Sequence, residues 1–286
     1  MRERDQQKNI ANLANFLLMV LCLILSRASA VSAAPGDIDT TFGNGGVSFT
    51  QVPNIYTGYN GPSAILTQPD GKILVCGQID SYGDDGWFFL ARLNPSGALD
   101  QTFGYQGMIV SLYNYPYVGA DMALQRDGKI VIVGNHGGYA AIQRYEPNGS
   151  PDFSFADSGT AYMELGGGAN SVALQPDGKI LVGLHLWESP PGIARLNSDG
   201  SPDEGFGENG VLITDPADMR SIRKILIQPG GKLVVVGGIP LETCCGTGGI
   251  AIMRYLPNGS RDSSFGSNGR VTRSNLSTLE YPQDAA

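Results

Sequence analysis

LQPDGKILVG, at residues 174–183, has the composition of a short β-hairpin, and the chain contains this hairpin four times. Proline presets the backbone at the first turn position, aspartate suits the second, and glycine takes the left-handed position that closes the turn. The other copies are LTQPDGKILVCG at 66–77, LQRDGKIVIVG at 124–134 and IQPGGKLVVVG at 227–237. The closing glycine is present each time, as Gly71, Gly128, Gly178 and Gly231. We therefore expect four hairpins of one kind.

Two further landmarks recur with the hairpins and define a repeat of 50 to 57 residues, measured between Gln68, Gln125, Gln175 and Gln228. An arginine-containing segment follows each hairpin: LARLNPSG at 90, IQRYEPNG at 142, IARLNSDG at 193 and IMRYLPNG at 252. A block of the form D-x-x-F begins at residues 39, 100, 152, 203 and 262. The chain thus holds four complete units and one surplus block, and such self-similarity is the signature of a repeat architecture.

Each unit divides into short strands, which in the first unit are expected at 45–50, 63–68, 72–77 and 88–94. The segment 72–77 is almost entirely apolar, so both faces of its sheet must be covered. Sheets stacked face to face around an axis achieve this. We predict an all-β fold, a β-propeller of four repeated four-stranded antiparallel blades plus one surplus strand, over residues 36–275. A linear stack of sheets is the alternative, and residues 276–286 form a tail.

The surplus strand could decide whether the ring of blades is closed or open. The chain opens with a strand at 45–50 and closes with one of the same type at 269–274. We expect a terminal strand to pair with the blade from the other end of the chain, which would close the ring. An open, incomplete ring is the alternative.

The N-terminal segment has the pattern of a signal peptide. Basic residues precede the apolar run FLLMVLCLIL at 16–25, and small residues allow cleavage after Ala30 or Ala33. Ten apolar residues are too few for a stable membrane span, which needs about 20. We therefore predict a signal peptide at 1–33 and an exported protein, whether secreted, periplasmic or on the cell surface. An uncleaved anchor is the alternative.

The charge of the chain disfavours nucleic-acid partners. The whole sequence has a net charge of −8, and removal of residues 1–33 leaves 15 basic against 25 acidic residues. The remaining chain has a net charge of −10, which would repel a phosphate backbone. The same acidity helps to keep an exported protein soluble.

The repeated pattern resembles a known family. ALQPDGKILVG at 173–183 and IARLNSDGSPDEGFGENGV at 193–211, with their counterparts, are similar to the delta-60 repeat of bacterial exported and surface proteins. The resemblance covers roughly residues 36–275. It implies a β-propeller-like fold and a secreted or envelope location. It implies no established activity, no catalytic residues and no cofactor.

Repeated polar residues are interpreted as architecture. Arginine recurs at 92, 144, 195 and 254, and aspartate recurs eight residues after each, at 100, 152, 203 and 262. We expect one Arg–Asp bridge in each unit, holding the turn region against its blade. Cys76 lies in an expected core strand as a buried free thiol, whereas Cys244 and Cys245 could pair with each other or with Cys76. The cysteines form no CxxC pattern and have no histidine at metal-binding spacing, so we do not predict a metal site.

Residues that do not repeat are the better candidates for function, because a rigid scaffold presents binding residues on variable loops. The variable loops are expected at one end of the blades and carry exposed aromatic residues suited to stacking on sugars or gripping a peptide. Packing of these rings over the blade ends is the structural alternative. The candidate ligand-binding residues are Tyr56, Tyr59, Tyr82, Trp87, Tyr113, Tyr115, Tyr117, His136, Tyr139, His185 and Trp187.

We expect a binding protein, whose ligand is a glycan, a peptide or an envelope protein. Only two histidines exist, and no G-x-S-x-G, H-E-x-x-H or P-loop pattern is present. Catalytic residues, metal ligands and cofactors are therefore not predicted. The alternatives are a propeller-type polysaccharide hydrolase or lyase that uses loop carboxylates and tyrosines, and a surface protein with a purely structural role.

Overall fold

The computed structural model describes residues 36–50, 60–81, 84–110, 120–239 and 249–273. The chain divides into two compact units, residues 1–47 and residues 48–286. In the described part of the second unit every regular element is a β-strand. Among the described residues there is no helix of the length and apolar character needed to cross a membrane.

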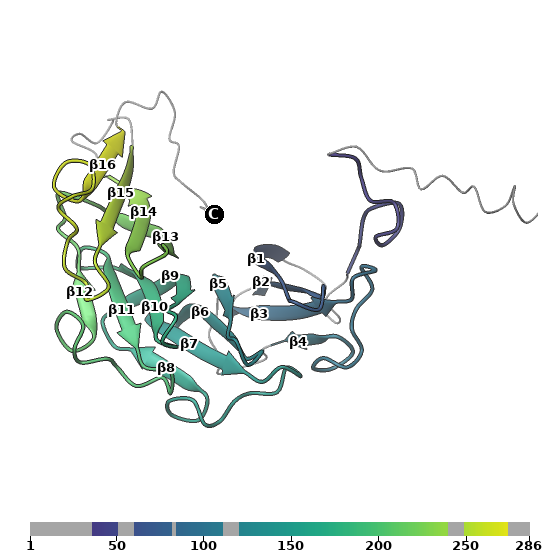
Figure 1. The fold of residues 1–286 in the computed structure, drawn as a ribbon. Helices are drawn as coiled ribbons and strands as arrows, with labels where there is room; N and C mark the ends of the chain where they lie inside the picture. Colours follow the sequence, from purple (N-terminus) through teal and green to yellow (C-terminus); the bar gives the residue numbers. More distant parts are fainter. Residues whose placement is uncertain (1–35, 51–59, 82–83, 111–119, 240–248, 274–286) are drawn as a thin grey trace, which may run out of the picture. The chain divides into compact units, whose positions relative to one another are not determined.

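The strands form four separate sheets, which we call blades 1 to 4 in chain order (Figure 1). Each blade contains four antiparallel strands that pair in sequence order. Blade 1 comprises β1 (Asn60–Thr67), β2 (Ile73–Ser81), β3 (Asp84–Leu93) and β4 (Met108–Val110), and blade 2 comprises β5 (Asp121–Leu124), β6 (Ile130–His136), β7 (Tyr139–Tyr145) and β8 (Thr160–Met163). Blade 3 comprises β9 (Gly167–Leu174), β10 (Ile180–Leu186), β11 (Gly192–Leu196) and β12 (Val211–Ile213), and blade 4 comprises β13 (Ser221–Ile227), β14 (Leu233–Gly238), β15 (Ile250–Tyr255) and β16 (Arg270–Arg273).

The predicted hairpins are confirmed as the connections between the first two strands of each blade. In blade 3, the Gln175 amide donates to the Lys179 carbonyl at 2.8 Å and the Gly178 amide donates to the Gln175 carbonyl at 2.9 Å. Gly178 has φ +89°, and the equivalent glycines of the other blades have φ between +80° and +85°. Glycine enters this left-handed region without steric penalty, so its recurrence fixes the turn.

The expected grouping of strands within a unit is wrong in one respect. The strand that follows the D-x-x-F block pairs with the strand before it, as where Ile142 of β7 faces Ala161 of β8. The reason is that the block folds back: the Phe155 amide donates to Asp152, the Gly159 amide to Phe155 and the Arg144 amide to Gly159. Each blade therefore ends with the short strand that the repeat pattern of the sequence places at the start of the next unit.

The expectation of a strand at 45–50 is also wrong, since this described segment forms no strand of any blade. In this segment the structure contains only an isolated bridge between Asn44 and Val47. At the other end, β16 pairs with β15 of its own blade. Among the described residues, therefore, no strand from one end of the chain pairs with the blade at the other end, so the predicted closure of the ring is not observed there.

Hydrophobic side chains fill the spaces between consecutive blades. Blade 1 and blade 2 share a cluster that includes Leu74, Phe88 and Ile130, all fully buried. Blades 2 and 3 share the cluster that contains Val131 and Leu184, and similar clusters are formed at the junction of blades 3 and 4. Each sheet thus covers the apolar face of its neighbour, as predicted.

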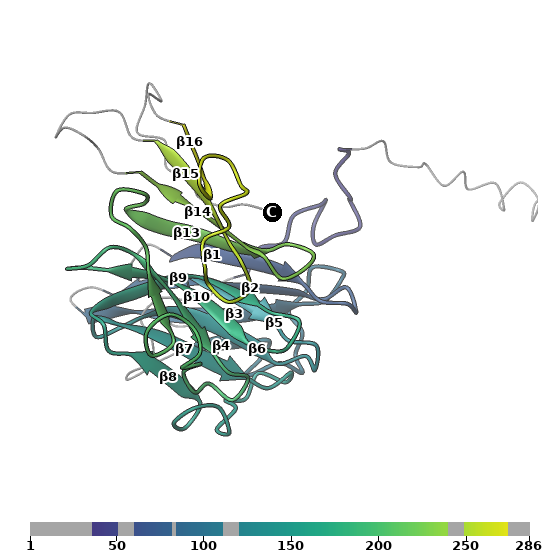
Figure 2. The same cartoon turned by 60° about the vertical axis from the view of Figure 1, so that its left-hand side comes forward.

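The innermost strands identify the arrangement as a propeller. β1 contacts β5, β5 contacts β9 and β9 contacts β13, whereas β4, β8, β12 and β16 lie at the far edges of their sheets (Figures 1 and 2). In addition, the Lys224 ammonium group of blade 4 lies 3.2 Å from the Asp121 carboxylate of blade 2. Such a contact between blades that are not consecutive requires the inner strands to gather around an axis, which a linear stack does not provide.

The connections divide between two ends of the blades. The hairpin turns connect the first strand of a blade to the second, and the D-x-x-F blocks connect the third to the fourth. The blocks add isolated bridges such as Tyr145–Pro151 but no further strand, so both connections lie at the same end of the antiparallel sheet. We call this end the turn end. The connections from the second to the third strand, and from each blade to the next, lie at the opposite end, which we call the loop end. Variable connections therefore share one end of the propeller.

Candidate functional site

The structure describes the side chains of four of the proposed ligand-binding residues: His136, Tyr139, His185 and Trp187. Trp87 lies in β3, where its backbone pairs with Ile79. The remaining candidates, Tyr56, Tyr59, Tyr82, Tyr113, Tyr115 and Tyr117, lie outside the described residues.

Trp187 is held in place and yet exposed at the loop end. A methyl group added at Gly138 of blade 2 would lie 2.8 Å from the Trp187 ring, so the indole lies directly on this glycine. The Trp187 amide donates to the Gly166 carbonyl at 3.3 Å, and the Gly167 amide donates to the Gly138 carbonyl at 2.6 Å. The side chain nevertheless remains 64% exposed. A ring with these supports is a preorganised surface for stacking.

A pocket of about 540 Å³ opens beside this ring and contains two of the proposed residues, His185 and Trp187. It combines an aromatic face with an imidazole, the Glu188 carboxylate and the Arg220 guanidinium group. The other lining residues are Leu186, Ser189, Pro190, Pro191, Pro216 and Met219. This mixture of an apolar surface and a few polar groups is typical of ligand pockets.

His136 and Tyr139 belong to a neighbouring hairpin and do not line this pocket. They face each other across the connection between β6 and β7. The His136 ring lies 5.5 Å from the ring of Tyr162, and Tyr139 is exposed. His185 therefore lines the loop-end pocket, whereas His136 contacts Tyr162.

A second pocket, of about 740 Å³, lies between the innermost strands and was not predicted from the sequence. All four blades contribute to its lining: Pro62, Ser63, Ala64, Ile65 and Val75 from blade 1, Ala120 and Asp121 from blade 2, Asn170 from blade 3, and Arg223 and Lys224 from blade 4. Its polar residues do not repeat, since the position of Asp121 is occupied by alanine, serine or lysine in the other blades. This absence of repetition is the signal that sequence reasoning could have used.

The charged side chains that line this axial pocket differ in their hydrogen-bond partners. Both oxygens of Asp121 lie 3.2 Å from the Lys224 ammonium group, and they also accept hydrogen bonds from the Met122 and Val172 amides. In contrast, the Nε atom of Arg223 is buried and has no hydrogen-bond partner among the described residues.

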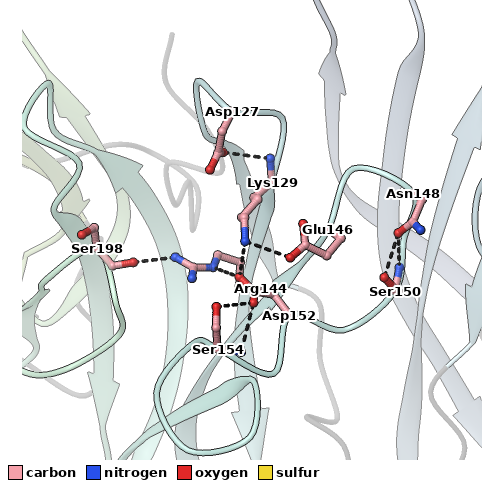
Figure 3. A network of polar contacts seen from close by, with 9 residues as sticks. All are labelled: Asp127, Lys129, Arg144, Glu146, Asn148, Ser150, Asp152, Ser154 and Ser198. Atoms are coloured by element: carbon pink, nitrogen blue, oxygen red, sulfur yellow. Dashed lines mark hydrogen bonds and ion pairs between the residues drawn. The ribbon is translucent and has the colours of Figure 1, made fainter.

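The repeated arginines and aspartates form the predicted bridges. Figure 3 shows the network of blade 2, in which Arg144 Nε donates to Asp152 at 2.6 Å and Lys129 Nζ donates to the same carboxylate at 2.8 Å. Burial disfavours the charged form of Asp152, but hydrogen bonds from Lys129, Ser154 and Arg144 outweigh it and lower its pKa. The bridges in the other blades join Arg92 to Asp100, Arg195 to Asp203 and Arg254 to Asp262.

Three of these arginines also contact the following blade, which the sequence interpretation missed. Arg144 Nη1 donates to the Ser198 carbonyl of blade 3, and its guanidinium group lies 4.5 Å from the centre of the Phe155 ring. Arg92 and Arg195 make the equivalent bonds to Pro147 and Pro257. The recurrence of phenylalanine in every D-x-x-F block was the available signal, since arginine stacks on aromatic rings.

Cys76 is fully buried in β2, as predicted. Burial and the charge of Asp121 raise the pKa of its thiol to about 12, so the thiolate is suppressed at neutral pH. Cys244 and Cys245 lie outside the described residues.

Three solved structures illustrate what the fold is similar to. A protein of unknown function from Bacteroides caccae is 14% identical, with a TM-score of 0.43 and coverage of 77% of this chain and 73% of its own. A bifunctional GH43-CE protein from Bacteroides eggerthii is 13% identical, with a TM-score of 0.44 and coverage of 82% and 30%. An exo-1,5-alpha-L-arabinanase from a bovine ruminal metagenomic library is 11% identical, with a TM-score of 0.39 and coverage of 79% and 82%. The chain spans 54% and 40% of two further matched structures.

No curated protein matches the chain in sequence. Four segments, residues 68–103, 125–155, 175–206 and 228–265, match the family described as "Domain of unknown function (DUF5122) beta-propeller". Each segment begins at a repeated glutamine and ends at the phenylalanine of a D-x-x-F block, so each blade has one match, which covers its second and third strands. The sequence matches and the structure therefore agree that the chain is a β-propeller built from four repeats.

Proposed function

We propose that this propeller is a binding protein and that its ligand is a glycan held at the loop end. The observation that supports this most directly is the pocket beside Trp187, in which an exposed indole is fixed against Gly138. A sugar ring can stack on such a face because its C–H groups are apolar on one side. His185, Glu188 and Arg220 supply hydrogen-bonding groups for its hydroxyls.

The polysaccharide hydrolase or lyase alternative is supported less well. Glycoside hydrolysis commonly uses two carboxylates on either side of the scissile bond. Among the described residues, Asp121 is the one carboxylate that lines the axial pocket, and it is bonded to Lys224 and to two main-chain amides. Glu188 is likewise the one carboxylate that the described part of the chain contributes to the loop-end pocket.

Export is part of the same proposal. Residues 1–33 have the composition of a signal peptide, and the repeat pattern resembles the delta-60 repeat of exported proteins. N-terminal sequencing of protein recovered from outside the cytoplasm should give a chain that begins after Ala30 or Ala33. Recovery of an intact N-terminus in the membrane fraction would instead support an uncleaved anchor.

Binding can be tested on a glycan array, with hits confirmed by calorimetry. The parent protein should retain a defined glycan, and Trp187→Ala should weaken binding about five- to thirtyfold, because loss of one stacking contact is worth about 1–2 kcal/mol. Tyr105→Ala is the matched control, since Tyr105 is an exposed aromatic residue at the turn end. Absence of glycan binding by the parent protein, or equal losses in both variants, would contradict the proposal.

A further inference from the structure

The three junctions between consecutive blades are built from the same set of contacts. An arginine of one blade donates to a turn carbonyl of the next blade, and a phenylalanine of the first blade packs on the glycine of that turn. Phe103 packs on Gly149, Phe155 on Gly200 and Phe206 on Gly259, where an added methyl group would lie 2.7–3.0 Å from the ring. All three phenylalanines are fully buried.

Blade 4 retains the donor half of this junction, although the described residues contain no further blade after it. Arg254 Nε donates to Asp262 at 2.8 Å, and the guanidinium group lies 4.5 Å from the centre of the Phe265 ring, as in the other blades. In the described residues, however, Arg254 donates to no turn of another blade. Its side chain is 19% exposed, against 8–10% for the three other arginines, and Phe265 is only half-buried.

The apolar face around Arg254 is uncovered in the same way. Ile252 of β15 is half-buried, whereas Leu90, Ile142 and Ile193, which occupy the same position in the other blades, are fully buried. Val271 pairs with Ile252 across the strands and is 44% exposed. We call this surface, formed by Val234, Val236, Ile252, Arg254, Phe265 and Val271, the open face of blade 4.

Blade 1 carries the acceptor half. Its turn at 94–97 has the same hydrogen bonds as the turns that receive arginine elsewhere, with the Gly97 amide donating to Asn94 at 2.8 Å. In the described residues no arginine donates to the Pro95 carbonyl, which occupies the position of Pro147 and Pro257. Ile65 is 73% exposed, while its counterparts in the three following blades, Met122, Val172 and Ile225, are 1–5% exposed.

We propose that the open face of blade 4 binds blade 1 of a second copy of this chain, in a head-to-tail contact that reproduces the internal junction. Arg254 would donate to the Pro95 carbonyl, and Phe265 would pack on Gly97. Within one chain no hydrophobic cluster of the described residues joins these two faces, since the clusters of blade 1 contain residues of blades 1 and 2 and the cluster of blade 4 contains residues of blades 3 and 4. A heterologous contact of this kind produces closed rings or open filaments.

The proposal is independent of the glycan site and is tested by the oligomeric state of the purified protein. Analytical ultracentrifugation should show concentration-dependent dimers or larger assemblies. Ile65→Asp on blade 1 and Val271→Asp on blade 4 should each reduce the protein to monomers. Both sites are exposed, so the single chain should tolerate the charge. Ile213→Asp, at a residue of β12 that is 45% exposed and lies on neither face, is the matched control and should leave the assembly unchanged.

A mixing experiment identifies the head-to-tail geometry. Ile65→Asp protein keeps an intact open face on blade 4, and Val271→Asp protein keeps an intact blade 1. Mixing equal amounts of the two variants should therefore give a one-to-one heterodimer that does not extend further. A monomeric parent protein, a variant that still assembles alone, or a mixture that stays monomeric would each overturn the proposal.

Discussion

Arg195 Nη1 of blade 3 donates a hydrogen bond of 2.6 Å to the Pro257 carbonyl oxygen of blade 4, 62 residues further along the chain. The same guanidinium group donates through Nε to Asp203 at 2.6 Å and lies 4.3 Å from the centre of the Phe206 ring. A planar group with several donors can satisfy a carboxylate, a carbonyl and an aromatic face together, which lysine cannot do. The repeated arginine therefore connects its blade to its own turn region and, in blades 1 to 3, also to the blade that follows.

The hairpin glycines should be essential because of their backbone conformation and not because of crowding. A methyl group at Gly178 would lie 3.6 Å from the nearest atom, Ser198 Cβ, so there is space for a side chain. Its φ of +89° is nevertheless unfavourable for alanine. Gly178→Ala should lower the free energy of unfolding by about 1–2 kcal/mol, measured by urea denaturation.

The control for this substitution is Gly205→Ala. Gly205 does not have a left-handed backbone, and its added methyl group would make an ordinary contact of 3.4 Å with Asp203. We expect a change of less than about 0.5 kcal/mol there. Equal losses at Gly178 and Gly205 would contradict the assignment of the hairpin turn.

The four bridging aspartates should make the protein sensitive to acid. The pKa of Asp203 is lowered by its hydrogen bond from Lys179, which outweighs burial, and the pKa values of Asp100, Asp152 and Asp262 are lowered as well. Because the folded-state pKa values lie below the unfolded value of about 3.9, the unfolded chain takes up protons first. The stabilisation is fully present above about pH 5 and is lost as the pH falls through the folded pKa values.

Urea midpoints measured from pH 7 to pH 3 should therefore be steady at first and then fall. Asp152→Asn should already be less stable at pH 7, because Arg144 and Lys129 lose their common partner. Its stability should also depend less on pH below 5, since one of the four groups no longer titrates. An unchanged acid slope in Asp152→Asn would show that this bridge does not contribute.

Cys76 should be chemically silent while the protein is folded. Its side chain is fully buried, and burial together with Asp121 raises the pKa of the thiol to about 12. Alkylation with iodoacetamide at pH 8, followed by peptide mass spectrometry, should leave the peptide that contains Cys76 unmodified. The same peptide should be labelled after denaturation. Labelling of the native protein at this residue would mean that β2 is not in the core.

Much of the fold could be predicted from the sequence because the same short-range patterns recur in four repeats. The Pro-Asp-Gly turns, the apolar strands between blades and the Arg–Asp pairs are all determined by residues close together in the chain. The pairing of the short last strand was predicted wrongly, since residues 160–163 could join either the preceding or the following sheet. The choice depends on how the block from Asp152 to Gly159 folds back.

The candidate site could be predicted only in part. Non-repeating aromatic residues indicated the loop end, and Trp187 and His185 do line a common pocket. The axial pocket depends on Asp121, Arg223 and their neighbours, which are up to about a hundred residues apart and meet only when the blades gather around an axis. The role of Phe265 and Arg254 at an open junction likewise required knowing which faces remain exposed.

The most direct test of this account compares Arg195→Lys with Arg254→Lys, because the two arginines differ in having a following blade to contact. Both substitutions weaken the bridge within a blade, and only Arg195→Lys also removes the bond to Pro257. Urea denaturation in the Val271→Asp background, where blade 4 has no partner, should show Arg195→Lys to be less stable than Arg254→Lys by about 1.5–3 kcal/mol. Equal stabilities of the two variants would contradict the conclusion that the repeated arginine joins neighbouring blades.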